Sequence, residues 1–376
     1  MNNNGAVTGG LEGVVAAETA LSSVDGEAGE LIIAGYPLEE LAPNSRFEQT
    51  LFLLWNGRLP DAAELETFIS RSSALREIST ATLRLLEDAA RRRRTPMDAL
   101  RMAAATLDLD DDAESDPADA GLAIVSRFPT IVATYWRLLN GREPLPIRGD
   151  LGLAAHYLYL LDGDASPAEA RVRALETYLN TVIDHGLNAS TFTARVIVST
   201  GSDLVSAVTG AVGALKGPLH GGAPAPALDM VFEIGAVEKA EAYLREKLER
   251  GERLMGFGHR IYRVRDPRAD VLAAAAGELY RNEGDAELYT LAIEVERIAL
   301  SLLKEHRPER QLQTNVEFYT ALLLHGLGLP SSLFTPTFAI SRVGGWIAHA
   351  LEQQKTGRLI RPQSRYTGER GRVWSN

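Results

Sequence analysis

Three histidines stand in segments where a neighbouring glycine lets another group come close to the side chain. His185 lies in DHGLNAST, His220 in PLHGGA and His259 in GFGHRIYRVRDPRAD. Glycine permits such an approach because it has no side chain in the way. The three imidazoles together could form a metal site, but no pair has the short spacing of a metal-binding motif. We therefore expect no metal, and each histidine taken alone also fits a structural role.

A cluster of basic side chains follows the third histidine. Arg260, Arg263, Arg265 and Arg268 come within ten residues of His259, in a stretch shaped by two glycines and a proline. The chain as a whole is acidic, so this concentration of positive charge predicts an anion-binding loop. A solvated basic loop is the alternative.

Two more arginines stand among apolar or rigid neighbours. Arg342 lies in AISRVGGWIAH and Arg361 in RLIRPQSRY. A planar guanidinium in such surroundings suits a carboxylate, which it can bind through two parallel hydrogen bonds. Either arginine alone also fits a structural ion pair.

One carboxylate, Glu317, precedes a strongly apolar run in TNVEFYTALLL. Acidic residues are favoured in the first turn of a helix, where they offset unpaired N–H groups and the helix dipole. By itself, the pattern therefore predicts an acid at a helix start.

The composition excludes several classes of protein. The net charge is −11, from 50 acidic and 39 basic residues, which disfavours a nucleic-acid partner. The basic run 91–94 could be an exception, but it continues a helical pattern and is interpreted as a solvent-exposed helix face. The chain has no cysteine, which excludes disulfides and thiolate nucleophiles. No basic and apolar leader and no apolar run of about 18 residues is present, so we expect a cytoplasmic protein without a membrane span. P-loop, HExxH and GxSxG motifs are missing, and GFGHRI lacks the third glycine of a dinucleotide fingerprint.

The elements that must position these residues are mostly helices. Residues 1–36 alternate apolar and polar side chains around Asp25-Gly26, which predicts a short β-hairpin. Apolar residues then recur at spacings of three and four, which predicts helices over 47–56, 62–73, 79–92, 97–107, 121–140, 151–162, 167–183 and 191–215. The chain is thus expected to be mainly α-helical, of the all-α class.

The pattern changes near residue 217. Gly210, Gly213 and Gly217 give one face of a predicted helix room for close contact with another helix. A segment rich in glycine and proline follows at 217–226 and predicts a hinge before a second block of helices over about 227–328. We expect the tail from about 331 to rejoin the first block.

The motifs together resemble the citrate synthase family, in its short archaeal and bacterial form. The resemblance spans nearly the whole chain and rests on GLEGVVAAETALSSVDG, DHGLNAST, LHGGA, GFGHRIYRVRDPRA, TNVEFY and SRVGGWIAHALEQ, in the order and at the spacings of that family. It implies a large domain from 1–219 and 330–376, with a small domain over 220–329 that closes over oxaloacetate. It also implies a homodimer, whose interface helices match 191–216 and 337–354.

The resemblance assigns a role to each candidate residue. His220 matches the histidine that hydrogen-bonds the thioester oxygen, Glu317 the base, and His259 the residue that polarises the oxaloacetate carbonyl. The residues that match oxaloacetate ligands are His185, Arg268, Arg342 and Arg361, the last of them lent by the partner subunit. For the CoA phosphates the nearest candidates are Arg260, Arg263 and Arg265.

The implied activity is condensation of acetyl-CoA with oxaloacetate and water to give citrate and CoA, with no cofactor. The family base is an aspartate, whereas this chain has Glu317, whose extra methylene moves the carboxylate by roughly 1 Å. A 2-methylcitrate synthase that uses propionyl-CoA is a second reading, because one methyl group is typically worth only about 1 to 3 kcal/mol of discrimination. A ligand-binding paralogue with little or no turnover is a third.

Overall fold

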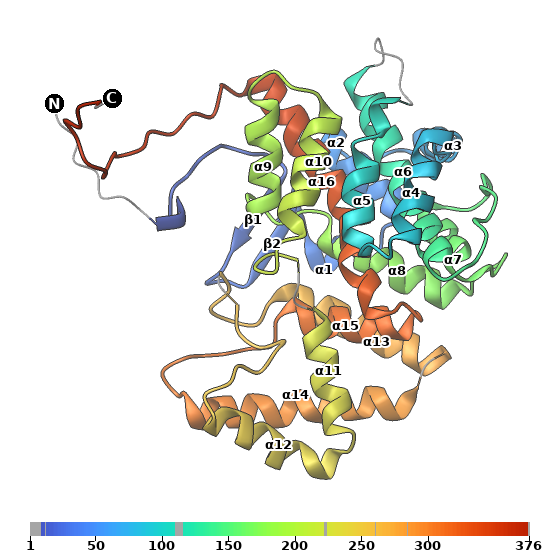
Figure 1. The fold of residues 1–376 in the computed structure, drawn as a ribbon. Helices are drawn as coiled ribbons and strands as arrows, with labels where there is room; N and C mark the ends of the chain where they lie inside the picture. The colour runs from blue at the N-terminus through green and yellow to red at the C-terminus, as the bar shows by residue number, and fades with distance from the viewer. Residues whose placement is uncertain are drawn as a thin grey trace.

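The computed structural model describes residues 9–11, 13–109, 116–221, 224–259, 261–283 and 285–374, and helices make up most of them. Figure 1 shows an upper group of helices, which includes α16, and a lower group formed by α11 to α15. The predicted mainly α-helical class is confirmed. No helix in these ranges is both long and apolar enough to cross a bilayer.

A small antiparallel sheet lies near the N-terminus. Its strands are β1 (Ser22–Asp25), β2 (Glu30–Ile33) and β3 (Tyr36–Pro37), in the order β1-β2-β3. Ser22 pairs with Ile33 and Asp25 with Glu30, so the turn falls where the sequence predicts the hairpin. The turn is stabilised because the Asp25 carboxylate accepts the backbone N–H groups of Glu27 and Ala28 at 2.9 and 2.8 Å.

The first helical block begins after the sheet. Short 3-10 helices precede or interrupt it at η1 (Gly9–Leu11) and η2 (Leu107–Leu109). Its α-helices are α1 (Leu38–Leu41), α2 (Phe47–Asn56), α3 (Ala62–Ala74), α4 (Thr80–Arg91), α5 (Pro96–Ala104), α6 (Pro117–Leu139), α7 (Leu153–Asp162), α8 (Glu169–Val182), α9 (Ala189–Val198) and α10 (Leu204–Leu215). The predicted helices from 47 to 183 all occur, with ends shifted by a few residues.

The single helix predicted over 191–215 is wrong, because the structure has α9 and α10 packed against each other. Gly201 has φ +84° in the turn between them, a conformation that glycine adopts readily. Asp203 then starts α10 by accepting the backbone N–H of Ser206 at 2.6 Å. Both helices bury apolar faces, so apolar residues recur at spacings of three and four on both sides of the turn. The sequence pattern therefore gives no sign of the break between the helices. The methyl of an alanine at Gly210 would lie 2.3 Å from Ile197 of α9, so this glycine serves the contact between the two helices.

The second block contains α11 (Pro224–Ile234), α12 (Val237–Glu249), α13 (Pro267–Glu283), α14 (Ala286–His306) and α15 (Val316–Gly326). In it, α12 packs on α14 and α11 on α15, while α13 packs both on α15 and on α8 of the first block. After η3 (Ser331–Leu333), the long helix α16 (Phe334–Thr356) returns to the first block and packs on α6, α9 and α10 (Figure 1). The domain limits stay a prediction.

A glycine on α16 brings this helix against the segment that carries His185. The Cβ of any other residue at Gly345 would lie 2.2 Å from the carbonyl oxygen of Ile183 and 3.2 Å from a carboxylate oxygen of Asp184. The first of these atoms is backbone at the end of α8 and has little freedom to move. The close approach therefore depends on the missing side chain.

We expect Gly345→Ala to lower the free energy of unfolding by about 1–3 kcal/mol, the usual cost of forcing extra atoms into a packed interior. Urea unfolding followed by circular dichroism measures it. Gly149→Ala is the control, since a Cβ there meets no atom within 4 Å. Equal stability of the two variants would show that the α16 contact relaxes easily.

Candidate functional site

Two separate segments pair by backbone hydrogen bonds and bring His259 next to the start of α15. The Gly258 N–H donates to the Gln313 carbonyl at 2.7 Å, and the Asn315 N–H donates to the Gly256 carbonyl at 2.9 Å. Gly256 and Gly258 have φ of +87° and +82°, so the two glycines are needed for this path of the chain. Residues far apart in sequence therefore meet at one place.

The imidazole of His259 is held by its own loop. Its Nδ1 accepts the backbone N–H groups of Ile261 and Tyr262, both at 3.0 Å. An acceptor nitrogen carries no proton, so the neutral ring carries its proton on Nε2. Burial and the Arg268 cation lower the pKa of His259 to about 4, which keeps the ring neutral at pH 7.

Arg268 lies beside this ring in a buried ion pair. Its guanidinium donates to both carboxylate oxygens of Asp266 at 3.0 and 2.8 Å, and its Nη2 lies 3.2 Å from His259 Nε2. Asp266 also accepts the backbone N–H of Val316 at 3.2 Å, so this carboxylate ties the start of α13 to the start of α15. Burial opposes the charge on Asp266, but Arg268 more than offsets it and the pKa of Asp266 is lowered.

His185 completes one side of the site. It is only 8% exposed, its Nε2 lies 3.1 Å from the Tyr262 hydroxyl oxygen, and its ring centre lies 6.0 Å from that of His259. Burial, together with Arg268 and Arg342, holds the pKa of His185 well below its usual value. The ring is therefore neutral and can act as a hydrogen-bond partner beside two cations.

His220 lies on a tight turn after α10. The turn requires Gly221, because a Cβ there would lie 2.3 Å from the Leu215 carbonyl oxygen. His220 Nε2 lies 2.7 Å from Ser190 Oγ, at the start of α9. Burial and the Arg342 cation lower the pKa of His220 to about 4. This ring too is neutral at pH 7.

Arg342 is a buried cation on α16. It is 2% exposed, its Nε donates to the Val182 carbonyl oxygen at 2.7 Å, and its guanidinium stacks on Phe338 with 4.5 Å to the ring centre. Within the described residues no carboxylate forms an ion pair with it. Burial lowers its pKa to about 10, so Arg342 is still charged at pH 7. A buried charge without a paired carboxylate is a place where an anionic ligand fits.

Glu317 is in the first turn of α15, as the sequence predicts. Its backbone N–H donates to the Oδ1 of the N-cap residue Asn315 at 3.0 Å. Burial raises the pKa of the Glu317 carboxyl, Arg268 opposes this and Asp266 adds to it. The carboxylate is thus half-buried next to the same ion pair that borders His259.

The structure gathers some of the predicted residues and leaves others apart. The charge of Arg268 shifts the pKa values of His185, His259 and Glu317. The charge of Arg342 shifts those of His185 and His220. These residues therefore share one electrostatic environment. Arg361 is exposed and lies on the C-terminal tail after α16, a segment that runs away from the helices (Figure 1).

The predicted CoA ligands have different surroundings. Arg265 donates to Asp270 and Glu296 at 2.5 and 2.8 Å, so its guanidinium already has two carboxylate partners. Arg263 is exposed, and its backbone N–H donates to the Gly26 carbonyl at 2.7 Å. Arg260 lies outside the described residues. The role of all three in CoA binding stays a prediction.

Four residues of the site were not predicted from the sequence: Ser190, Tyr262, Asp266 and Trp346. Three of them lie inside the quoted motifs DHGLNAST and GFGHRIYRVRDPRAD, where a polar side chain in the same motif as a candidate histidine was the available signal. Trp346 gave no such signal, because its indole Nε1 contacts Ser190 Oγ, 156 residues earlier in the chain.

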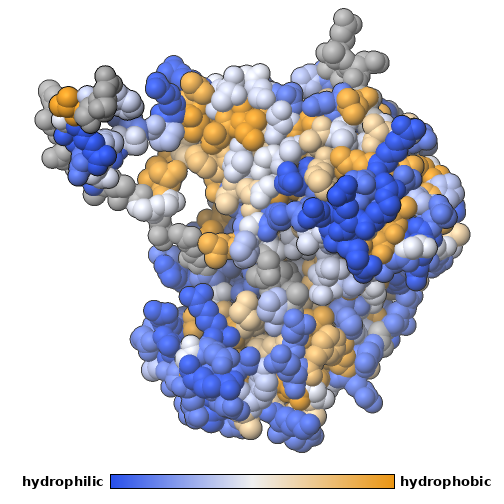
Figure 2. Space-filling view, viewed as in Figure 1, coloured by the Kyte–Doolittle hydropathy of each residue, from blue (hydrophilic) through white to orange (hydrophobic). Residues whose placement is uncertain are grey.

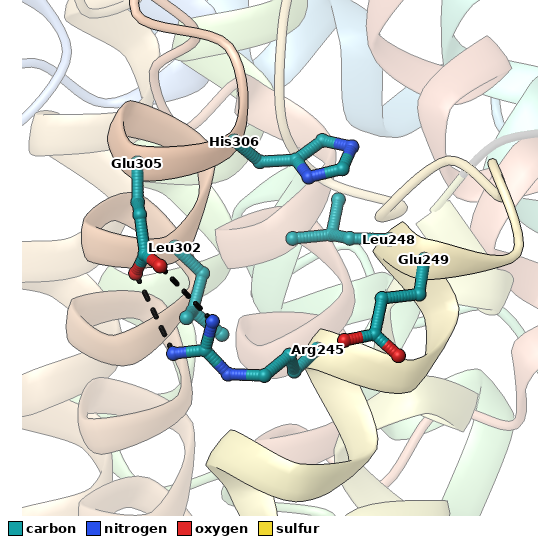
Figure 3. Close-up of a pocket in the computed structure, with 6 residues that line it drawn as sticks. All are labelled: Arg245, Leu248, Glu249, Leu302, Glu305 and His306. Carbon is teal, nitrogen blue, oxygen red and sulfur yellow. Dashed lines mark hydrogen bonds and ion pairs between the residues drawn. The ribbon is translucent and has the colours of Figure 1, made fainter.

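A pocket of about 240 Å³ elsewhere contains none of these residues. It lies between α12 and α14, where Arg245 pairs with Glu305 at 3.1 Å (Figure 3). In the part of the chain that the structure describes, no three His, Cys, Asp or Glu side chains are grouped as a metal site requires.

A family model described as "Citrate synthase, C-terminal domain" matches residues 10–363. The chain belongs to the citrate synthase family. It is 42% identical over 366 residues to "Citrate synthase 2" of Bacillus subtilis, covering 96% of both chains. It is 39% identical over 370 residues to "2-methylcitrate synthase" of Mycobacterium tuberculosis, covering 97% of this chain and 91% of the relative.

Solved citrate synthases have the same fold. The Thermoplasma acidophilum citrate synthase, in a ternary complex with carboxymethyl coenzyme A and oxaloacetate, superposes with a TM-score of 0.87 at 28% identity, covering 98% of this chain and 97% of the other. The family resemblance drawn from the motifs is therefore confirmed over almost the whole length of this citrate synthase family member.

Proposed function

We propose that the protein is an acyltransferase that condenses acetyl-CoA with oxaloacetate and water to give citrate and CoA. It belongs to a family whose matched relatives are named citrate synthases and 2-methylcitrate synthases. The residues of the candidate site fit the chemistry that this reaction requires.

The observation that carries the proposal is a pair of donors without an acceptor between them. His259 Nε2 bears the proton of the neutral ring, yet it lies 3.2 Å from Arg268 Nη2, which is also a donor. Asp266 Oδ2 is 3.9 Å from His259 Nε2, too far to accept a hydrogen bond from it. An oxygen placed next to both donors accepts from both, and the keto oxygen of oxaloacetate is such an oxygen.

The chemistry then follows in two bond-forming steps. Glu317 takes a proton from the methyl group of acetyl-CoA, while His220 donates a hydrogen bond to the thioester oxygen on which charge develops. The methyl carbon attacks the keto carbon of oxaloacetate, and the new alkoxide receives the proton of His259 Nε2. Water then adds to the thioester carbonyl, and the carbon–sulfur bond breaks to release CoA. No cofactor takes part in this proposal.

The substrate carboxylates need cations that are already desolvated. Arg342 supplies one without a competing ion pair among the described residues, and Arg268 supplies a second from its pair with Asp266. We propose that His185 holds a further oxygen of oxaloacetate. These roles match those that the family resemblance implies.

The experiment that tests the function measures release of the CoA thiol from acetyl-CoA and from propionyl-CoA, each with oxaloacetate. The chain has no cysteine, so a thiol reagent sees only the product. We expect release with acetyl-CoA. A clear preference for propionyl-CoA would instead establish 2-methylcitrate synthase, which the similarity to the Mycobacterium tuberculosis relative favours as the second candidate. No release from either substrate, with oxaloacetate still bound, would establish a ligand-binding paralogue.

We further propose a cytoplasmic homodimer with a large domain from 1–219 and 330–376 and a small domain from 220–329. The packing of α16 on α6, α9 and α10 supports a large domain made from both ends of the chain. Hydrophobic surface over α9 and α10 supports a second copy docking there (Figure 2). In such a dimer, Arg361 on the exposed tail would complete the oxaloacetate site of the other subunit.

A further inference from the structure

The first residue of β1 contacts the chain on both sides of His185. The Ser22 hydroxyl donates to the Asp184 carboxylate, and its oxygen accepts the backbone N–H of Gly186 at 3.1 Å. Asp184 directly precedes the histidine and Gly186 directly follows it. The base of the β1-β2 hairpin is therefore fixed to the segment that carries His185.

Asp184 is a firm anchor for this contact because it is held by buried side chains. Arg195 Nε donates to His349 Nδ1 at 3.0 Å, so the proton of the His349 ring lies on Nε2. That nitrogen donates to Asp184 Oδ1 at 3.1 Å. Asp184 and His349 are 0% exposed and Arg195 is 2% exposed. The base of the hairpin is thus tied, through one carboxylate, to α9 and α16 of the first helical block.

The turn of the same hairpin contacts the loop over 261–265, which belongs to the second block. The Gly26 carbonyl oxygen accepts the backbone N–H of Arg263 at 2.7 Å. A Cβ at Gly26 would lie 2.3 Å from the Ile261 carbonyl oxygen, so the two backbones touch where this glycine has no side chain. The hairpin therefore connects the two blocks.

The loop that the turn contacts holds both histidines of this side of the site. The backbone N–H groups of Ile261 and Tyr262 donate to His259 Nδ1, and the Tyr262 hydroxyl oxygen lies 3.1 Å from His185 Nε2. The centres of the two imidazole rings are 6.0 Å apart. A shift of the loop relative to the His185 segment changes that separation.

The hairpin is stiff enough to hold its two ends at a fixed distance. Its strands pair in register from one end to the other, and Leu31 and Ile33 of β2 are 0% exposed. The Asp25 carboxylate closes the turn by accepting two backbone N–H groups. From Ser22 to Gly26 an extended strand spans roughly 13 Å. The turn therefore moves together with the base.

We propose that the β1-β2 hairpin is a positioning element for the oxaloacetate site, in which Ser22 and Gly26 hold the segments of His185 and His259 at a fixed separation. The inference rests on the proposed function for the identity of the ligand, whereas the contacts of the hairpin belong to the protein without substrate. Because oxaloacetate needs both rings at once, a loosened hairpin lowers the fraction of molecules that are ready to bind it.

Asp25→Ala tests the role of the hairpin without altering either end of it. Among the described residues, the exposed Asp25 carboxylate hydrogen-bonds only the backbone N–H groups of Glu27 and Ala28, within the turn itself. We expect the KM for oxaloacetate to rise about 3- to 10-fold and kcat to stay within twofold, because a bound substrate restores the separation of the rings. Initial rates at saturating acetyl-CoA measure both. An unchanged KM would overturn the proposal.

Asp61→Ala is the matched control. Asp61 is also exposed, and its carboxylate accepts the backbone N–H of Glu64 at 2.9 Å at the start of α3, so the substitution removes a comparable local hydrogen bond outside the site. We expect both kinetic parameters to stay within twofold of the parent. A rise in the KM for oxaloacetate equal to that of Asp25→Ala would mean that general loosening of the fold explains both variants.

Gly26→Ala tests the contact at the turn. The added methyl meets the Ile261 carbonyl oxygen, so the turn and the loop must move apart. We expect the KM for oxaloacetate to rise about 5- to 100-fold, the equivalent of forcing one methyl into a packed contact. Gly149→Ala, whose Cβ meets no atom within 4 Å, should keep the KM of the parent. A parental KM in Gly26→Ala would show that the contact does not position the loop.

Amide hydrogen exchange of the ligand-free protein separates this proposal from the proposed function. Mass spectrometry of peptides that cover 257–266 reports the N–H groups that bind His259 and Gly26. We expect these amides to exchange at least about 5-fold faster in Asp25→Ala and at the parental rate in Asp61→Ala. Unchanged exchange in Asp25→Ala overturns the positioning role whether or not the protein releases CoA. Faster exchange in a protein that releases no CoA counts against the proposed function alone.

Discussion

Glu317→Gln is expected to lower the rate of CoA release by about 10²- to 10⁴-fold, the range typical for loss of a general base. Glutamine keeps the shape of the side chain but cannot accept the methyl proton. Oxaloacetate binding should stay within twofold, because Arg268 and Arg342 are unchanged. Initial rates with acetyl-CoA give kcat, and calorimetric titration with oxaloacetate gives the affinity.

The same substitution should not weaken the fold. Burial raises the pKa of Glu317 above its unfolded value, so the folded state disfavours the ionised carboxylate. Removing that charge should leave the free energy of unfolding unchanged or raise it. Lost activity together with retained stability distinguishes a base from a residue that only starts a helix.

Glu287→Gln is the control for the helix-start interpretation. Glu287 occupies the same position of α14, its backbone N–H donating to the N-cap residue Asp285 at 3.0 Å, but it is exposed. We expect full activity in this variant. If Glu317→Gln behaves like Glu287→Gln and keeps full activity, Glu317 is a helix-start acid and the base lies elsewhere. Glu317→Asp then shows whether the longer side chain is a handicap or fits this pocket.

Most of the residues that the structure groups in the candidate site could be picked out from the sequence, because they sit in local motifs with their own turns. Glycines next to His220 and His259 do have the close contacts and positive φ angles that their presence suggests. The hairpin around Asp25 and the helix start at Glu317 were readable for the same reason, since a turn residue and a first-turn acid act within a few positions.

What the sequence could not give is the pairing of charges between distant elements. Arg265 and Arg268 look alike in the motif, yet Arg265 is paired across the fold with Glu296 of α14, while Arg268 reaches His259. The contact of Trp346 with Ser190 joins helices that are adjacent only after folding. The break between α9 and α10 was missed for a different reason, because two packed helices can continue one apolar spacing across a short turn.

Arg342→Met is expected to weaken oxaloacetate binding by about 2–5 kcal/mol, or roughly 30- to 4,000-fold, as loss of one partner of a buried charge pair does. Methionine keeps contact with Phe338 but has no donor for a carboxylate. The ligand-free protein should be as stable as the parent or more stable, because no described carboxylate pairs with Arg342 and its burial is costly. Calorimetric titration with oxaloacetate and urea unfolding without it measure the two effects.

Arg195→Met provides the opposite case and decides between a ligand-binding and a structural cation. Arg195 is also 2% exposed, but its guanidinium is paired with Glu352 and donates to His349 and Gln353 at 3.0 and 3.1 Å. Removing it leaves buried acceptors without a partner, so the free energy of unfolding should fall by about 3–5 kcal/mol. A cation held for the fold costs stability when removed, whereas a cation held for a ligand costs affinity. If Arg342→Met destabilises the protein as much as Arg195→Met and leaves oxaloacetate affinity unchanged, Arg342 is a structural cation. Arg268 is then the remaining candidate for binding a substrate carboxylate.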